Sequence, residues 1–311
     1  MNFVSLMPPI AYALVVLFAC LYAVTSSVEF GAALLTLPKK SFIDHKSLST
    51  YMSPVWEAVN VFLVFTVVGL VMFFPGVVPP LALALYAPAS IALVFYGVRV
   101  LGIQGVLYSD SKHPIFRVLF ALGSVGGPIV LSLVYYYLIT GLSPLSPTTA
   151  ELSLIGIVVS AIYAISSAFF LYFIPKNTER ARLAHVAAAA ELCFAAFSVV
   201  FLGLVAQYLS SVTGVLSLTI IVAVISLVYV SLVHHAKYVW ALVLAALNVI
   251  LLIAGIAVMH APYILYRSLD IYSTFTSVEV FTNVLYALPF GLLAIVPAVF
   301  LLFKMYAVKK N

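Results

Sequence analysis

Nine long apolar segments constrain what this chain can fold into more than any other feature of its sequence. Each is long enough to supply the about 20 residues that an α-helix needs to cross the hydrocarbon core of a membrane. They cover residues 8–36, 54–74, 78–103, 114–140, 152–174, 181–207, 212–233, 238–259 and 280–303. Charged residues make up only 7% of the 311 residues, whereas a soluble domain carries about 25%. We therefore expect an all-α, polytopic membrane helix bundle.

Turn-forming residues separate these segments. Phe74-Pro75-Gly76 follows the second segment and the Ser143–Pro147 stretch follows the fourth, and proline and glycine at such points favour turns. Ser53-Pro54 is typical of a helix start, with serine as the N-cap and proline at the first helical position. Residues 1–9 carry no basic cluster and no small-residue cleavage motif, so we expect the first segment to be retained as a span.

Basic residues fall almost entirely on one side of the predicted membrane. Thirteen of the fourteen Lys and Arg residues lie in or beside the connections after odd-numbered segments or in the C-terminal tail, and Arg267 lies opposite. The thirteen are Lys39, Lys40, Lys46, Arg99, Lys112, Arg117, Lys176, Arg180, Arg182, Lys237, Lys304, Lys309 and Lys310. By the positive-inside rule the N-terminus is expected outside and the C-terminus in the cytoplasm. This topology explains the basic pI without a nucleic-acid partner.

The alternation of basic and non-basic connections repeats after four segments. This repeat predicts two four-helix units, at 1–141 and 142–260. An outer loop, a ninth helix and a basic cytoplasmic tail follow over 261–311.

Two acidic residues near the cytoplasmic ends of the first two segments are the main candidate functional groups. Glu29 lies about two turns before the end of its segment, and Glu57 lies in the first predicted turn of the next. A carboxylate inside a membrane is costly, at about 2.5–3.5 kcal/mol or more. Glu57 either benefits from the helix dipole at the interface or transfers protons with Asn60, on the same helix face. Glu29 either transfers protons or forms an interhelical lock, and Thr25 and Ser26 are within reach of it.

Other polar groups lie deeper in the chain. Glu191 follows the small residues Ala187–Ala190, so it is either a proton-relay group or a hydrogen-bonded packing contact. Asn248 is expected to form an interhelical hydrogen bond. A glycine cluster followed by proline predicts close helix packing and a kink: Gly123, Gly126, Gly127 and Pro128.

The histidines and cysteines do not suggest a metal or haem site in this chain. All of the histidines except His185 lie in or beside predicted connections, and none pairs with another across the centre of a span. The six are His45, His113, His185, His234, His235 and His260. Cys20 and Cys193 lie inside apolar segments without CxxC spacing. We expect no haem and no metal to be bound by this chain alone.

Two stretches resemble subunit II of cytochrome bd-type quinol oxidases. Tyr22–Gly31, which contains Glu29, is similar to the opening signature of that family, although Ser26 stands where the family has an aspartate. Ser53–Leu63 is similar to its proline-x-tryptophan-acid stretch through Pro54, Trp56 and Glu57, with Ala58-Val59-Asn60 in place of glycine-asparagine-glutamine. Looser similarity continues at Phe74-Pro75, Glu179–Arg182, Ser268–Ser273 and Lys304–Tyr306.

The resemblance implies a haem-free subunit in the cell membrane of a prokaryote. Its partner would be a homologous subunit that carries haems b and d, with small accessory membrane subunits as further candidates. The complex would oxidise quinol and reduce oxygen to water. Glu29 and Glu57, with Asn60, Ser26 and Thr25, would then contribute a cytoplasmic proton path, and the chain could hold a structural quinone or lipid.

Two alternatives remain at the level of sequence. One is a bd-like membrane anchor for another b-type cytochrome complex. The other is a secondary transporter with its site at Glu191 and Asn248. Transporters built from two repeats commonly have broken helices at corresponding positions. Here the prolines Pro88 and Pro128 have no clear counterparts in the seventh and eighth segments, which weakens this alternative.

Overall fold

Nine α-helices build the part of the chain that the computed structural model describes. This part comprises residues 3–37, 42–43, 45–108, 113–142, 148–173 and 179–308, with the backbone alone at 3–4, 45–58, 292, 294–296 and 298–308. The helices are α1 (Phe3–Leu35), α2 (His45–Phe73), α3 (Val78–Tyr108), α4 (Pro114–Thr140), α5 (Thr149–Phe173), α6 (Arg180–Val205), α7 (Val212–His234), α8 (Tyr238–His260) and α9 (Val278–Val308).

The lengths and apolar character of the helices confirm a polytopic all-α membrane protein. On the side chains that are described, α1 and α3 to α8 are each long and apolar enough to cross a membrane. The helices α2 and α9 comprise 29 and 31 residues. At about 1.5 Å per residue, both exceed the roughly 30 Å of a hydrocarbon core.

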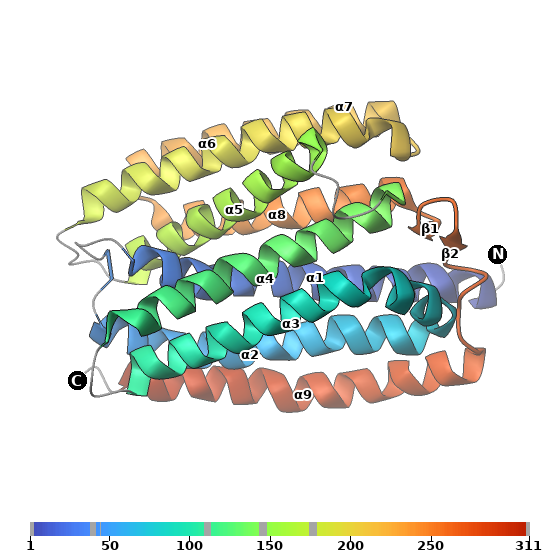
Figure 1. Cartoon of the computed structure of the whole chain (residues 1–311), viewed down its shortest axis with the longest axis horizontal. Coiled ribbons are helices and arrows are strands. Elements are labelled where there is room, and N and C mark those ends of the chain that lie inside the picture. Colours follow the sequence, from blue (N-terminus) through green and yellow to red (C-terminus); the bar gives the residue numbers. More distant parts are fainter. Residues whose placement is uncertain are drawn as a thin grey trace.

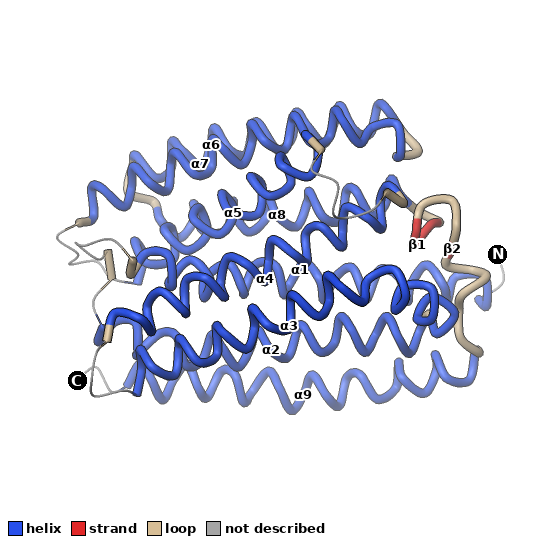
Figure 2. Tube along the Cα trace, in the orientation of Figure 1, coloured by secondary structure: helices blue, strands red, loops and turns tan. Residues whose placement is uncertain are grey.

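The helices lie alongside one another in an elongated bundle, and little of the described chain is outside a helix (Figures 1 and 2). In Figure 1, α5 to α8 occupy the upper part of the view, and α1 to α4 with α9 occupy the lower part. Helix α1 packs against α2, α4, α5 and α8, so it joins the two groups. The division at residue 141 stays a prediction.

One end of the bundle carries the basic residues that the structure describes near helix termini. Helices α4, α6 and α8 begin at the end where α9 finishes (Figure 1), and Arg117, Arg180, Arg182 and Lys237 lie there, within four residues of those helix starts. We call this the basic end. Arg99 does not belong to it, because it lies nine residues before the end of α3 and is only 2% exposed. Grouping Arg99 with the third connection was therefore wrong, while the expected cytoplasmic location of the basic end stays a prediction.

The predicted start of α2 at Ser53-Pro54 is also wrong. The helix begins at His45, so Pro54 lies inside it and Glu57 lies twelve residues from the start rather than in the first turn. That is about 18 Å along the axis. A proline removes one backbone hydrogen bond, but membrane helices tolerate this loss, and α1, α3, α4 and α9 also contain internal prolines.

Opposite the basic end, the connections that the structure describes are short turns and one hairpin. Phe74-Pro75-Gly76 forms the expected turn, with the 3₁₀ helix Pro75–Val77 between α2 and α3; a second 3₁₀ turn, Ala206–Tyr208, follows α6. The Ser143–Pro147 turn lies outside the described residues. Between α8 and α9, strands β1 (Tyr263–Leu265) and β2 (Leu269–Asp270) pair antiparallel, which the sequence did not predict.

Hydrogen bonds fix this hairpin to the bundle. The backbone N–H of Tyr266 donates to the carbonyl of Leu138 in α4 at 3.0 Å. The Asp270 carboxylate accepts from the Ser273 hydroxyl at 2.7 Å and from the backbone N–H groups of Ser273 and Tyr272. These bonds, the Ser273 hydroxyl first, hold the pKa of Asp270 below its ordinary value.

Glycines bring α3 and α4 into close contact, as the glycine cluster predicted. A Cβ atom at Gly123 would overlap the backbone of Phe95 and Arg99, and one at Gly126 would overlap the Phe95 ring. From the other side, a Cβ at Gly102 would overlap the backbone of Phe120. Small residues at helix interfaces permit this approach in membrane bundles.

The contact at Gly102 makes a testable prediction. Gly102→Ala should lower the free energy of unfolding by about 1–3 kcal/mol, because the new methyl group meets rigid backbone and pushes the helices apart. Gly97→Ala is the matched control in the same helix, since no heavy atom lies within 4 Å of its added Cβ and alanine favours a helix. Thermal unfolding of the purified protein should show a lower midpoint for the first variant only. Equal midpoints would contradict the close packing.

Candidate functional site: a buried ion pair beside an apolar cavity

A buried ion pair between α1 and α3 is the central feature of the candidate site. The Arg99 Nη1 atom lies 3.2 Å from the Glu29 Oε1 atom, and the two side chains are 3% and 0% exposed. The angles of this contact are outside those of a hydrogen bond, and among the described residues neither carboxylate oxygen of Glu29 has a hydrogen-bond partner. The attraction is therefore electrostatic, and the carboxylate keeps unused capacity to accept hydrogen bonds.

Aromatic rings enclose the guanidinium group. Its carbon lies 5.1 Å from the centre of the Phe30 ring and 5.0 Å from the centre of the Tyr96 ring, within the range of a cation–π interaction. The Tyr96 hydroxyl is hydrogen-bonded to the Tyr22 hydroxyl. Because Phe30 follows Glu29 in α1 and Tyr96 lies one turn before Arg99 in α3, both helices supply a charge and a ring to the same cluster.

Helix packing, rather than local sequence, buries Arg99. Gly123 of α4 lies against the Arg99 backbone, where any side chain would overlap it. On the other side of α1, a Cβ at Gly31 would overlap the Ser166 side chain of α5. The two glycines let α4 approach α3 and α5 approach α1 closely, which excludes water from the pair.

Thr25 and Ser26 hydrogen-bond to their own helix. The Thr25 hydroxyl donates to the Leu21 carbonyl at 2.7 Å, and the Ser26 hydroxyl donates to the Ala23 carbonyl at 3.3 Å. Neither donates to Glu29. Their oxygens still have lone pairs, and Ser26 lines the apolar cavity described below.

The structure describes less of the second candidate acid. Glu57 lies on the described backbone of α2, but its side chain is outside the described residues. Asn60, three residues further along the same helix, is half-buried. A contact between Glu57 and Glu29 therefore stays a prediction.

An apolar cavity of about 410 Å³ runs beside α1, between it and α2, α4, α5, α6 and α8. Most of its wall is aliphatic or aromatic, and Tyr22 and Phe30 link it to the surroundings of Arg99. Its polar lining residues are Tyr12, Tyr22, Ser26, Ser27, Thr66, Ser132, Tyr135 and His260. The cavity thus approaches the ion pair from the side of α1.

His260 is the buried histidine of the described chain. It is 5% exposed, it packs beside the rings of Tyr263 and Tyr266, and no hydrogen-bond partner meets its ring nitrogens among the described residues. The cavity that it lines contains no second histidine, methionine or cysteine. Nor do three or more His, Cys, Asp or Glu side chains gather elsewhere in the described residues. These residues do not fit a haem with two axial ligands.

Glu191 and Asn248 meet in a second buried network that joins α6, α7 and α8. The Asn248 side-chain nitrogen donates to Glu191 Oε1 at 2.6 Å, and the Ser226 hydroxyl donates to the same oxygen at 3.0 Å. Asn248 also lies 2.9 Å from the Ser226 oxygen. The interhelical hydrogen bond expected of Asn248 is confirmed. The groups bind one another and do not line the apolar cavity, which favours a packing lock over a transport site.

The pairing of Arg99 with Glu29 was not predicted from the sequence. The usable signal was an arginine inside an apolar segment, 78–103, where a charge needs a partner. Glu29 and Glu191 were the two acids far enough inside the apolar segments to pair with this arginine. In the structure the partner is Glu29.

The ion pair makes a prediction about stability. Glu29→Gln should destabilise the protein by about 3–5 kcal/mol, because it leaves Arg99 charged, buried and unpaired. Arg99→Gln should destabilise it less, because the Glu29 carboxylate can take up a proton and become neutral. The double variant Glu29→Gln/Arg99→Gln should recover most of this loss. Thermal unfolding midpoints of the four proteins form a double-mutant cycle. Additive losses would mean that the two charges do not interact.

Comparisons with known proteins agree with this fold. The family model described as cytochrome bd terminal oxidase subunit II matches residues 7–306. A Bacillus subtilis (strain 168) protein with the provisional name cytochrome bd menaquinol oxidase subunit II is 35% identical over 85 residues, 26% of this chain and 25% of that protein, so the match spans a quarter of its length. The bd oxidase structure from Geobacillus thermodenitrificans has a chain that aligns with a TM-score of 0.84 and 23% identity, over 98% of this chain and 99% of that one.

The family model matches nearly the whole chain, and the fold agrees with it. This chain belongs to the cytochrome bd terminal oxidase subunit II family.

Proposed function

We propose that this chain is the haem-free membrane subunit of a bd-type quinol:oxygen oxidoreductase. It supports a homologous haem-bearing subunit in the cell membrane of a prokaryote, and haems b and d belong to that partner. Family membership over residues 7–306 supports this role. The scattered histidines and the unsuitable surroundings of His260 are in keeping with a subunit that carries no haem. A bd-like anchor for another b-type cytochrome complex is the alternative.

The proposed contribution of this chain to turnover is a proton path that uses the ion pair. The observation that carries it is a buried carboxyl group, Glu29, whose only described polar contact is the charge of Arg99. Glu29 carries a proton by alternating between a charged form paired with Arg99 and a neutral form. The positive charge of Arg99 stays in place while the proton moves, because guanidinium groups do not lose their proton in proteins.

The path begins at the basic end. Glu57 and Asn60 of α2 take protons from the aqueous side, and Glu29 receives them on α1. From there the Tyr96 and Tyr22 hydroxyls lead toward the apolar cavity, with Ser26 and Thr25 as further acceptors along α1. Ordered water would have to bridge any gap longer than a hydrogen bond.

The apolar cavity suits a lipid or a structural quinone in this proposal. Its long apolar wall matches an acyl or isoprenoid chain, and its few hydroxyl groups suit a polar head. Such an occupant would fill space beside α1 and support the packing around the ion pair. Small accessory membrane subunits and quinol itself are further expected partners of the complex.

The experiment that tests the proton path replaces both members of the ion pair at once, so that one negative and one positive charge are removed together. Glu29→Gln alone leaves the Arg99 charge buried without its partner. The informative protein is therefore Glu29→Gln/Arg99→Gln, purified as a complex with the haem-bearing subunit. We expect normal haem content and oxygen consumption slowed by about tenfold or more, since a group that transfers protons typically contributes 10²–10⁴-fold when no substitute exists. Glu57→Gln should slow turnover less, because Asn60 and ordered water can lead to Glu29 without it.

Glu191→Gln is the matched control, a buried acid outside the path. It should keep both haem content and oxygen consumption. If the Glu29→Gln/Arg99→Gln complex assembles with full haem and consumes oxygen at the parental rate across the pH range, the ion pair is a packing contact and the proton path is wrong.

A further inference from the structure

Helices α5 to α8 enclose a layer of polar side chains that the proton path does not use. The four helices pack in a ring, in which α5 and α7 each contact both α6 and α8. Hydrogen bonds cross this ring in both diagonal directions. Asn248 of α8 donates to Glu191 of α6 at 2.6 Å, and the Tyr229 hydroxyl of α7 donates to the Ala164 carbonyl of α5 at 2.9 Å. Opposite helices are therefore joined through the centre of the ring.

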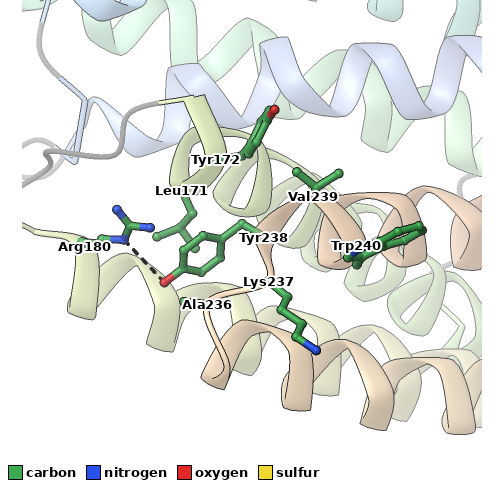
Figure 3. A pocket seen from close by; sticks show the side chains of 8 residues that line it. All are labelled: Leu171, Tyr172, Arg180, Ala236, Lys237, Tyr238, Val239 and Trp240. Atoms are coloured by element: carbon green, nitrogen blue, oxygen red, sulfur yellow. Dashed lines mark hydrogen bonds between the residues drawn. The ribbon is translucent and has the colours of Figure 1, made fainter.

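Glu191 lies in this layer without a counter-charge among the described residues. It is 1% exposed, and no Lys, Arg or His nitrogen of the described chain lies within 4 Å of its carboxyl oxygens. The cations of α6 and α8 are at the basic end, and Arg182, nine residues before Glu191, is about 14 Å away along the axis. Figure 3 shows Arg180 directed at the Tyr238 hydroxyl, with Lys237 on the other side of that ring. An ionised Glu191 would be a buried, unpaired carboxylate.

We propose that Glu191 keeps its proton in every redox state of the complex and is the neutral centre of a polar layer that fixes the register of α5 to α8. A buried carboxylate without a partner costs far more than a neutral, hydrogen-bonded group. The neutral acid retains the bonds that the structure describes, because its Oε1 atom accepts from Asn248 and Ser226. The proton then belongs on Oε2, where it adds one O–H donor to the layer.

Asn248 supplies an acceptor that lacks a donor. Its Nδ2 atom donates to Glu191 and lies 2.9 Å from the Ser226 oxygen. Its Oδ1 atom is buried and has no hydrogen-bond partner among the described residues. The O–H group of a neutral Glu191 can donate to this oxygen directly or through one ordered water, whereas a carboxylate has no hydrogen to donate. One proton thus removes an unpaired charge and an unmet acceptor together.

The layer selects one register of the ring. Ser226 and Tyr229 lie one turn apart in α7, and both are fully buried. Sliding α7 by one turn, about 5.4 Å, would separate both from their partners and place polar groups against apolar side chains. A single buried polar side chain fixes helix register in coiled coils in the same way. Because the layer carries no net charge, we expect it to stay unchanged while the charge of Glu29 alternates.

The test is the infrared spectrum of the purified complex in its oxidised and reduced states, because protonated carboxyl groups and carboxylates absorb in separate regions. Glu191→Gln should remove one protonated-carboxyl band from both states and leave the carboxylate region unchanged. Its thermal unfolding midpoint should equal that of the parent, since the glutamine amide also offers an acceptor and a donor. Loss of a carboxylate band, or a Glu191 band that differs between the redox states, would overturn the proposal.

Ser226→Ala tests the layer with the acid still in place. The Oε1 atom of Glu191 loses one hydrogen bond, so the protonated-carboxyl band should move to higher frequency and the unfolding midpoint should fall by about 2 °C. Ser217→Ala is the matched control in α7, because the Ser217 hydroxyl is exposed and donates to the Thr213 carbonyl of its own helix at 2.9 Å. It should leave both unchanged. A band that stays in place in Ser226→Ala, or moves equally in Ser217→Ala, would contradict the neutral centre.

Discussion

A charge buried in a membrane protein must be paired, and the structure of this chain depends on how that requirement is met. Arg99 cannot lose its proton and cannot reach water from inside α3, so α1 has to supply Glu29 at the same depth. Glycines make this possible, because Gly123 allows α4 to approach the Arg99 backbone. Burying such a pair rarely adds stability over an apolar contact. Its presence therefore points to a role in function or in specifying the packing.

Helix α1 connects that pair to the rest of the bundle. It contacts α5 and α8 as well as α2 and α4. Its residues supply one member of the ion pair, Glu29, and line the apolar cavity. The second group has a separate buried network, in which Glu191 is hydrogen-bonded by Asn248 and Ser226. The two acids thus have opposite surroundings: one is paired with a charge and retains free acceptor capacity, and the other is held by neutral donors.

The sequence predicted the elements whose signals are local, and missed those that depend on helix contacts. Apolar segments located the nine helices of the described part of the chain, and Phe74-Pro75-Gly76 located a turn. The Ser53-Pro54 signal misplaced the start of α2, because an internal proline looks like a helix start when its context is not known. Glu29 was identified as a candidate, but Arg99 lies 70 residues away and was counted with a connection. Only the packing of α3 against α1 and α4 reveals the pair.

The most direct test of the central claim is whether the protonation of Glu29 changes during the redox cycle. Infrared difference spectra between the oxidised and reduced complex report changes at individual carboxyl groups. We expect a carboxyl signal in the parent that is absent from Glu29→Gln/Arg99→Gln and present in Glu191→Gln. Identical carboxyl regions in the parent and in the Glu29→Gln/Arg99→Gln complex would show that Glu29 neither gains nor loses a proton, and would contradict its role as a proton carrier.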